Sequence, residues 1–271
     1  MRTLPSIDIV IPVLNEEVQL AECVLCLLSF LNKIQKYTYR ILIADNGSED
    51  RTPVIGQSLA HRFDSVFYFR IHQRGRGRAL AQCWMDSHVD MVAYMDVDLS
   101  TDLHDFPKLM APLIQGHADL SVGTRLSSAS RTRRSLKRDF LSRCYNRLIQ
   151  TMFRVTFTDA QCGFKAMTTS AAKALLPFIE SKHWFWDTEL LLLASHLGYR
   201  IANVPVTWTE DQDSRVKLLE TISEDIKGLI RMRRTLSGSV NQCHPPLSRL
   251  ANPSGMPFVP NQMASQRKED G

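Results

Sequence analysis

Short apolar segments rich in β-branched residues alternate with helical patterns through the first half of the chain, and this alternation constrains the fold most. Five strands are predicted at 7–13, 40–45, 65–71, 91–98 and 118–123. The helices predicted between them span 17–33, 52–62, 78–88 and 105–115. Strands that are apolar at nearly every position are typical of a parallel sheet with helices on both faces. The sequence therefore predicts an α/β fold with a mainly parallel, Rossmann-like central sheet.

The second half of the chain is less regular. A basic loop precedes predicted helices over 136–153, 170–179 and 187–197, predicted strands over 163–167 and 199–208, and an amphipathic C-terminal helix over 216–234. Five prolines interrupt the polar stretch that begins at residue 237, so we expect the tail 237–271 to be disordered. We therefore expect one domain over 1–236, in two halves at 7–125 and 126–236.

Composition excludes several classes of protein. Hydrophobic residues make up 44% of the 271 residues and charged residues 23%, which excludes a wholly disordered chain. Six cysteines are too few for a disulfide scaffold, so we expect a reducing, cytoplasmic compartment. The longest apolar stretch without a charge, residues 23–32, is ten residues long, whereas a membrane-spanning helix needs about 20. We therefore expect no transmembrane helix.

Positive charge is concentrated in one segment. The net charge is +5, but residues 131–147 alone carry seven cations against the single acid Asp139, so the rest of the chain is close to neutral. A single basic cluster indicates one anionic contact surface, which could be a phosphate, a membrane face or a nucleic acid. The alternative is a solvated basic loop without a ligand. The chain has no RNA-binding motif with interleaved aromatic residues, so we expect no nucleic-acid partner.

Polar side chains follow each of the five predicted strands. These are Asn15, Glu16 and Glu17, then Asp45 and Asn46, then the run 74–78, then Asp96 and Asp98, and finally Arg125. In an open parallel sheet, ligands bind outside the carboxyl ends of the strands. Any one of these residues could be a helix cap or part of a solvated turn. Their coincidence at five strand ends predicts one polar cleft.

Asp96 and Asp98 place two carboxylates one residue apart at the end of an apolar strand. Their oxygens can converge on a hard cation such as Mg²⁺ or Mn²⁺, which would bridge phosphate oxygens. The same DVDLS sequence also resembles the nucleophile motif of haloacid-dehalogenase-type phosphatases. That motif normally lies on the first strand of its domain, whereas other strand-helix units precede it here, so a phosphatase is the weaker reading.

The sequence RGRGRAL at 74–80 places two glycines before a predicted helix, where backbone amides can approach an anion. Leu80 stands where a dinucleotide fingerprint would have its third glycine, which argues against an NAD enzyme. The motif is therefore a candidate phosphate-binding turn.

The motifs taken together resemble family 2 glycosyltransferases of the GT-A fold. The sequences IVIPVLNEE, IADNGSEDRT, RGRGRAL, YMDVDLSTD and VGTR occur in the order found in that family. The later sequences TDAQCGFKAM, HWFWDTELLLLA and VPVTWTEDQDSRVKLLETISEDIKGLIRMR resemble the dolichyl-phosphate or polyprenyl-phosphate β-glucosyltransferase branch. The resemblance covers roughly residues 7–235 and implies a nucleotide-binding half at 7–125 and an acceptor half at 126–236. Asn46 departs from it, because many relatives carry a second Asp at that position.

The resemblance implies a role for each matching residue. The nucleotide-binding residues are Pro12, Asn15, Glu16, Asp45, Arg78, Asp96 and Arg215, with Asp45 accepting from an N–H of the base. Asp98, with Asp96 beside it, would hold Mg²⁺ or Mn²⁺. The residues implied around the donor sugar and the acceptor phosphate are Arg125, Gln161, Lys165, Asp187 and Glu189. From the charge of the basic loop we add Arg131, Arg133 and Arg134 as seats for the acceptor phosphate.

The implied reaction is inverting transfer of a hexose, most directly glucose from UDP-glucose, to a polyprenyl or dolichyl phosphate. A lipid phosphate is already an anionic nucleophile at neutral pH, so it needs cations rather than a general base. The alternatives are the same fold using GDP-mannose or a saccharide hydroxyl and, more distantly, a basic membrane-binding module. Because the chain offers no spanning helix, we expect peripheral attachment to the cytoplasmic face of a membrane, with or without a membrane protein partner.

Overall fold

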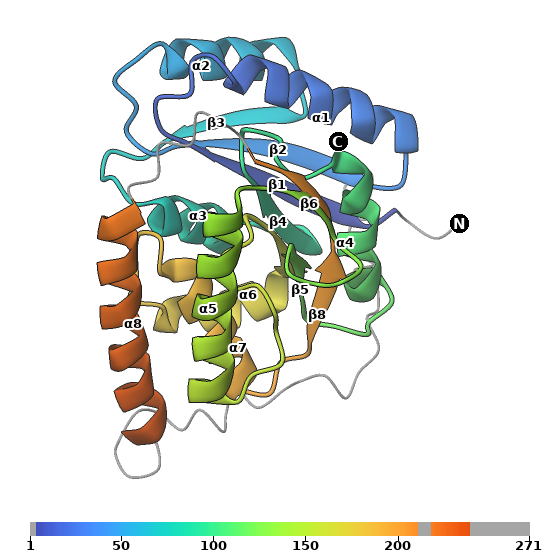
Figure 1. The fold of residues 1–271 in the computed structure, drawn as a ribbon. Coiled ribbons are helices and arrows are strands. Elements are labelled where there is room, and N and C mark those ends of the chain that lie inside the picture. Colours follow the sequence, from blue (N-terminus) through green and yellow to red (C-terminus); the bar gives the residue numbers. More distant parts are fainter. Residues whose placement is uncertain (1–3, 211–217, 239–271) are drawn as a thin grey trace, which may run out of the picture.

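The computed structural model describes residues 4–210 and 218–238, and its centre is a seven-stranded sheet (Figure 1). The order across the sheet is β3-β2-β1-β4-β7-β5-β8. The bounds of these strands are β1 Ser6–Val13, β2 Thr38–Asp45, β3 Val66–Arg70, β4 Met91–Met95, β5 Leu120–Thr124, β7 Phe164–Thr168 and β8 Ile201–Pro205. All neighbouring strands are parallel except β7, which is antiparallel to both β4 and β5. The predicted α/β fold with a mainly parallel sheet is confirmed.

Helices cover both faces of the sheet because its central strands are apolar on both sides. Along β1, Ile7, Ile9 and Ile11 face one core cluster and Val10 faces the other, as the two-residue period of a strand requires. Helices α1 Leu20–Ile34, α2 Thr52–Arg62 and α4 Phe106–Ile114 pack on the first face. Helices α3 Arg76–Met85, α5 Leu136–Phe153, α6 Thr169–Leu175, α7 Trp186–His196 and α8 Leu218–Gly238 pack on the second. Short 3₁₀ turns, η1 Leu103–Asp105 and η2 Leu176–Phe178, adjoin α4 and α6.

The antiparallel strand β7 brings its first residues to the edge where the parallel strands end. Phe164 pairs with Met95, the last residue of β4, and Lys165 pairs with both Tyr94 of β4 and Val122 of β5. A strand in this direction therefore contributes its amino end to the edge at which its neighbours present their carboxyl ends. As a result, Lys165 lies next to the residues that follow β4 and β5.

The basic loop forms part of a second, small sheet. Its first residues form β6 Arg131–Arg133, which pairs in parallel with β9 Thr207–Thr209. The single strand predicted over 199–208 is wrong in this respect, because it divides at Val206 into β8, which extends the main sheet, and β9. Val206 is fully buried, so the chain changes partners there without exposing its apolar side chain.

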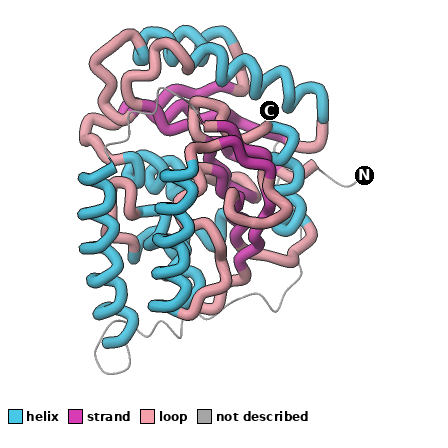
Figure 2. The backbone as a smooth tube through the Cα atoms, in the orientation of Figure 1, coloured by secondary structure: helices cyan, strands magenta, loops and turns pink. Residues whose placement is uncertain are grey.

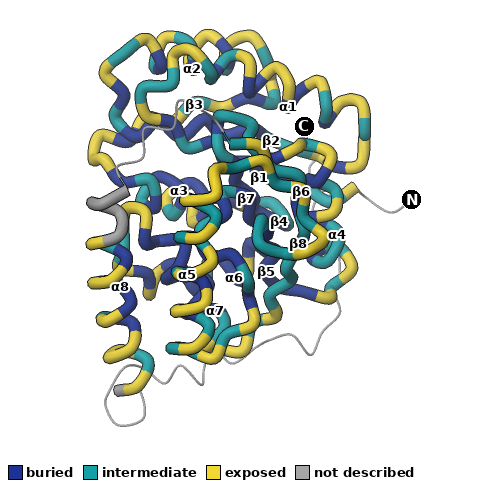
Figure 3. The backbone as a smooth tube through the Cα atoms, viewed as in Figure 1, coloured by how far each residue is buried: buried dark blue, intermediate teal, exposed yellow. Residues whose placement is uncertain are grey.

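Helices α5 and α8 contact each other and lie side by side at the front of the molecule, where their outward faces are exposed (Figures 1–3). The helix α5 begins and ends where the sequence predicts. Within the described part of the chain, no helix combines the length and apolar character needed to cross a bilayer. The tail 239–271, for which we predict disorder, lies outside the described residues.

Candidate functional site

The strand ends of β1 and β2 form the first part of the site, around Asp45. This residue is fully buried, and its carboxylate accepts hydrogen bonds from the backbone N–H of Ser48 at 2.8 Å and from the hydroxyl of Tyr68 at 2.5 Å. Burial raises the pKa of Tyr68 and the neighbouring Asp45 carboxylate raises it further, so the phenol remains a donor. Asp45 is therefore held in a single orientation at the carboxyl end of β2.

The loop after β1 is held against the loop after β2. The backbone N–H of Asn15 donates to Ser48 Oγ at 2.9 Å, and that of Glu16 donates to Thr52 Oγ1 at 2.8 Å. Asn15 has a φ of 58°, a left-handed conformation that asparagine tolerates better than most residues. Pro12, in register with Ala44 of β2, immediately precedes this turn. The structure thus brings Pro12, Asn15, Glu16 and Asp45 to one edge of the sheet.

The centre of the site is an ion-pair network that joins β4, β7, α3 and α7. The guanidinium of Arg76 donates to Asp96 Oδ1 and to Asp187 Oδ2, both at 2.6 Å. Lys165 Nζ donates to Asp187 Oδ1 at 2.7 Å and to the carbonyl of Cys162 at 2.7 Å. The hydroxyl of Tyr94 also donates to Asp187. The network therefore brings together Asp96, Lys165 and Asp187, three of the residues that the resemblance implies.

Two buried cations hold Asp187 ionised. Burial alone would raise the pKa of its carboxyl, but Lys165 and Arg76 together bring that pKa below its usual value. The Arg76 guanidinium, which also lies 5.1 Å from the ring centres of both Tyr94 and Trp184, has its pKa raised by Asp96 and Asp187 against the opposing effect of burial. A carboxylate with a lowered pKa is a weak base, so Asp187 is poorly suited to accept a proton at neutral pH.

Asp96 and Asp98 fit a hard divalent cation. Asp96 keeps 43% of its side chain exposed, and Asp98 is half-buried and accepts from the N–H of Ser100 at 2.9 Å. Gly163 makes room for Asp96, because a Cβ at this glycine would lie 1.6 Å from Asp96 Oδ2. In the described residues no group of three His, Cys, Asp or Glu side chains forms a cation cage. Two carboxylates of this kind suit a cation whose remaining ligands come from phosphate oxygens and water.

A second pair of buried charges lies after β5. Arg125 binds Asp159 through two hydrogen bonds of 2.8 and 2.9 Å, and Asp159 also accepts from the Arg125 backbone N–H. Burial would raise the pKa of Asp159, but Arg125 lowers it, so the pair remains charged. The Arg125 guanidinium stacks 5.5 Å from the ring centre of Trp208. Arg125 is thus fixed beside the site by a carboxylate that the sequence analysis does not identify.

The three arginines predicted to seat a phosphate occupy two different environments. Arg131 and Arg133 are exposed on β6. The side chain of Arg134 is only 7% exposed, stacks 5.6 Å from the ring centre of Trp208, and leaves its Nε and Nη1 without hydrogen-bond partners. Burial and the nearby Arg125 lower the pKa of Arg134, as expected for a cation that lacks a full counter-charge. Of the three, Arg134 is the one held inside the fold, with two donor atoms that no described acceptor satisfies.

The other predicted residues have protein partners of their own. Glu189 accepts from the backbone of Glu180 and Ser181 and binds Arg231 through bonds of 2.9 and 2.8 Å, which ties α7 to α8. Gln161 donates to a residue of α8. Arg78 lines a cavity of about 300 Å³ with residues of α3, η2 and the following loop, whereas Arg76, two positions earlier, reaches Asp96. Arg215 lies outside the described residues.

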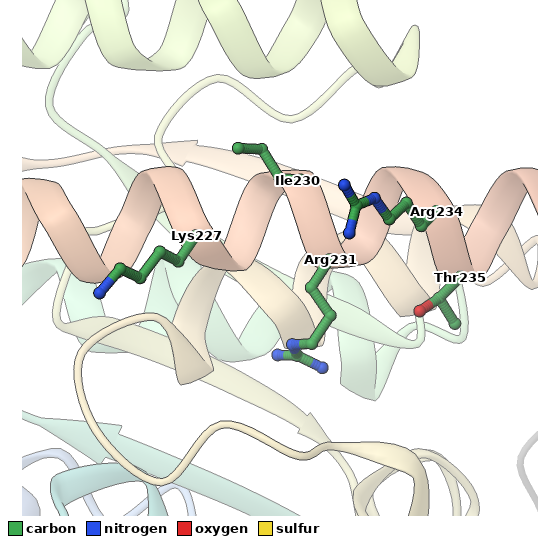
Figure 4. A pocket seen from close by; sticks show the side chains of 5 residues that line it. All are labelled: Lys227, Ile230, Arg231, Arg234 and Thr235. Atoms are coloured by element: carbon green, nitrogen blue, oxygen red, sulfur yellow. The ribbon is translucent and has the colours of Figure 1, made fainter.

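A surface cavity of about 360 Å³ lies along α8 and is separate from the strand ends. Its described lining residues are Lys227, Ile230, Arg231, Arg234 and Thr235, shown in Figure 4. Arg231 points to one side of α8, and Ile230 and Arg234 point to the other. Arg231 is bound to Glu189 of α7. The described lining of this cavity consists mainly of cations with one apolar side chain, and none of these residues lies at a strand end.

Comparison with known proteins agrees with this arrangement. The model of the glycosyl transferase family 2 matches residues 8–176. A glycosyltransferase named AglD from Haloferax volcanii is 33% identical over 219 residues, covering 80% of this chain but only 35% of its own length. The dolichyl-phosphate beta-glucosyltransferases of Dictyostelium discoideum and Mus musculus are 28% and 30% identical, covering 84% and 78% of this chain and 73% and 69% of their own.

Solved structures share the fold at lower identity. Glucosyl-3-phosphoglycerate synthase from Mycobacterium tuberculosis, crystallised with Mn²⁺, UDP-glucose and phosphoglyceric acid, superposes with a TM-score of 0.63 at 18% identity. The superposition covers 84% of this chain and 80% of that protein. The same enzyme with Mn²⁺, UDP and its product superposes with a TM-score of 0.62 at 19% identity.

Proposed function

This chain belongs to glycosyl transferase family 2, and on that premise we propose that it transfers glucose from UDP-glucose to a polyprenyl or dolichyl phosphate. The named relatives, two of them dolichyl-phosphate beta-glucosyltransferases, support the acceptor class. The fold shared with an enzyme crystallised with Mn²⁺ and UDP-glucose supports the donor and the metal.

One observation carries the choice of acceptor: the carboxylate at the centre of the site is neutralised by cations. Asp187 binds Arg76 and Lys165, and its pKa is lowered by Lys165 and Arg76 against the effect of burial. A hydroxyl acceptor needs a base with a pKa near the working pH, whereas a phosphate monoester needs only positive charge and correct placement. The cations around this centre therefore favour an acceptor that is already an anion.

Departure of the nucleoside diphosphate places negative charge near the end of β4. Asp98, with Asp96 beside it, would hold Mg²⁺ or Mn²⁺, which when bound supplies positive charge to the diphosphate oxygens. Asp45 holds the base, and Arg76 keeps Asp96 in place through its 2.6 Å bond. Arg125, fixed by Asp159, and Arg134, with two unsatisfied donors, supply the positive charge on the acceptor side.

We also place the protein peripherally at an anionic membrane, on the cytoplasmic side. The exposed outer faces of α5 and α8 combine apolar side chains with cations; the apolar ones are Leu136, Phe140, Leu148, Ile226 and Ile230. The exposed cations on the same helices include Lys137, Arg147, Lys227 and Arg234. Each cation near an anionic leaflet contributes about 1 kcal/mol. Among the described cysteines all five are unpaired thiols, which supports a reducing compartment.

A screen of donors and acceptors tests the proposal directly. Purified protein with Mg²⁺ or Mn²⁺ is incubated with UDP-glucose or GDP-mannose, and with a polyprenyl phosphate or a soluble saccharide. Lipid product and free nucleotide are both measured. Glucosyl lipid and UDP should appear together in equal amounts. Product formed from GDP-mannose, or on a saccharide hydroxyl, would contradict the donor or the acceptor assignment respectively.

The first prediction concerns the base of the nucleotide. If Asp45 accepts from an N–H of uracil, UDP should bind about tenfold or more tightly than GDP, a difference of about 1.4 kcal/mol. Isothermal titration calorimetry with both nucleotides and Mn²⁺ measures this ratio. Asp50, a half-buried carboxylate later in the same loop, provides the control, since Asp50→Asn should leave the ratio unchanged. GDP binding more tightly than UDP would reverse the assignment.

The second prediction separates the arginines of the basic loop. Replacing Arg134 by Ser should raise the KM for polyprenyl phosphate by about tenfold or more and leave UDP-glucose affinity nearly unchanged, because the proposed function places Arg134 on the acceptor side. Replacing both Arg131 and Arg133 by Ser should instead weaken binding to anionic vesicles, by up to about 2 kcal/mol or roughly thirtyfold.

Arg143→Ser is the matched control for the Arg134 variant. Arg143 is an exposed cation of α5 that pairs with Asp139 one turn away. Its loss should leave the KM for the lipid phosphate unchanged. If Arg134→Ser lowers donor affinity as much as it raises the acceptor KM, the residue belongs to the diphosphate site and the acceptor assignment is wrong.

A further inference from the structure

The inner face of α8 makes three polar contacts with segments that build the site. Arg231 binds Glu189 of α7, and Glu224 Oε1 accepts from the backbone N–H of Phe185 at 3.2 Å. Asp225 Oδ2 accepts from Gln161 Nε2 at 2.8 Å. The first two contacts fix the start of α7. The third reaches a side chain that the proposed function places at the sugar.

Asp225 is a buried carboxylate that binds Gln161 through one oxygen. The residue is 4% exposed, and its Oδ2 is the oxygen that accepts from Gln161. Tyr145 of α5 faces it, with its hydroxyl 3.1 Å from Thr188 Oγ1 of α7. The charged groups that act on Asp225 are Glu224 on its own helix and Asp187 on α7. A buried carboxylate next to two other acids is costly to keep ionised. Nothing in the sequence gives a structural reason for an acid at this position.

The position of Gln161 is coupled to the reaction centre through the next two residues. The carbonyl of Cys162 accepts from Lys165 Nζ at 2.7 Å, and Gly163 packs directly against the Asp96 carboxylate. The Gln161 side chain is half-buried at this point. A rotation of its amide would therefore change what is presented to a ligand at the site without moving the backbone.

The chemistry of the two groups determines how that amide is turned. An ionised carboxylate can only accept hydrogen bonds, so it must receive the NH₂ group of Gln161. The carbonyl oxygen of Gln161 is then left to accept from a ligand. A protonated carboxyl can donate, so it also permits the reverse orientation, in which the NH₂ group faces the ligand.

We propose that Asp225 is a positioning residue that, when ionised, turns the carbonyl oxygen of Gln161 toward a hydroxyl of the donor sugar. This inference rests on the proposed function for the identity of the ligand, but not for the coupling between the two side chains. The inner face of α8 would then take part in donor recognition, whereas its outer, cationic face is the one proposed to contact the membrane.

The coupling should respond to pH near neutrality. Burial, together with Glu224 and Asp187, raises the pKa of Asp225 to about 7 against the opposing effect of hydrogen bonds from Tyr145 and Gln161. Because the pKa in the folded protein is above that of an unfolded Asp, the folded chain takes up a proton as pH falls from about 8 to about 6. The orientation of the Gln161 amide that an ionised Asp225 requires is therefore populated above pH 7 and lost below it.

Calorimetry of UDP-glucose and UDP at pH 6 and pH 8 tests the ligand side. UDP lacks the sugar, so the ratio of the two affinities isolates the sugar contact. In the wild type this ratio should favour UDP-glucose about threefold to tenfold more at pH 8 than at pH 6, the effect expected of one hydrogen bond. Asp225→Asn should make the ratio independent of pH. Glu224→Gln, the matched control, should keep the pH dependence with its midpoint at lower pH.

A measurement without ligand keeps the inference separate from the proposed function. In ¹⁵N-resolved NMR spectra the side-chain amide of Gln161, assigned by its absence in Gln161→Ala, should titrate with a midpoint near pH 7. The same signal should not titrate in Asp225→Asn. If the amide does not titrate in the wild type, or if Asp225→Asn keeps a pH-dependent affinity ratio, the inference is wrong. Failure of the wild type to bind UDP-glucose while the amide titrates would instead overturn the donor assignment.

Discussion

Replacement of Asp98 by Asn is expected to lower the rate of transfer about a thousandfold or more without unfolding the protein. The carboxylate follows β4 and is half-buried, and an amide of nearly the same shape replaces it without removing apolar packing from the core. Asn keeps the oxygen that accepts from the backbone N–H of Ser100 at 2.9 Å, but it loses the negative charge that would hold a divalent cation. Loss of charge stabilisation at a leaving group has effects of this size.

Asp102→Asn is a closely matched control for this variant. Asp102 follows the same strand and accepts from the backbone N–H two residues later, also at 2.9 Å, but it is exposed beside His104. Its activity should stay within about twofold of the wild type, and thermal unfolding of both variants should match the wild type. Full activity of Asp98→Asn, or of the wild type in excess chelator, would contradict the assigned metal site.

The local sequence pattern predicts where the helices and strands lie better than it predicts which strands pair with one another. The limits of α5 and α2 follow from periodicity and flanking residues, and the observed helices agree. The pairing of β6 with β9 joins residues far apart in the chain, and periodicity carries no information about such partners. The same limit explains why the strand predicted over 199–208 is in fact two strands.

The residues of the candidate site also fall into two groups: some are predictable from their position in the sequence, and others depend on how the elements pack. Strand-end position identifies Asp96 and Lys165 as neighbours once the sheet order is known. Choosing Arg76 rather than Arg78 as the cation at Asp96 depends on which way the first turn of α3 faces, and this is set by packing against α7. Asp225 is 64 residues from Gln161, and nothing in its local sequence distinguishes it from the other acids of a surface helix.

The largest effect on stability is expected at Asp187. Replacing it by Asn leaves Arg76 and Lys165, whose side chains are 14% and 3% exposed, facing a neutral amide. Removing one partner of a buried ion pair costs about 3–5 kcal/mol, which for a domain of this size lowers the Tm by about 10 °C. Because the pKa of Asp187 is lowered in the folded state, its contribution is complete above the pKa of an unfolded Asp and is lost as pH falls below about 4. Thermal unfolding at pH 7 and at a series of pH values below 4 measures both effects.

A second substitution distinguishes the electrostatic cause from a packing defect. Adding Lys165→Met to Asp187→Asn removes one of the two unpaired cations, so part of the lost Tm should return. Asp139→Asn, which breaks an exposed pair with Arg143, should change stability by no more than about 0.5 kcal/mol. Transfer activity should stay lost in the double variant, because both charges act at the reaction centre. Recovery of activity together with stability would show that Lys165 and Asp187 serve the fold alone and would remove them from the site.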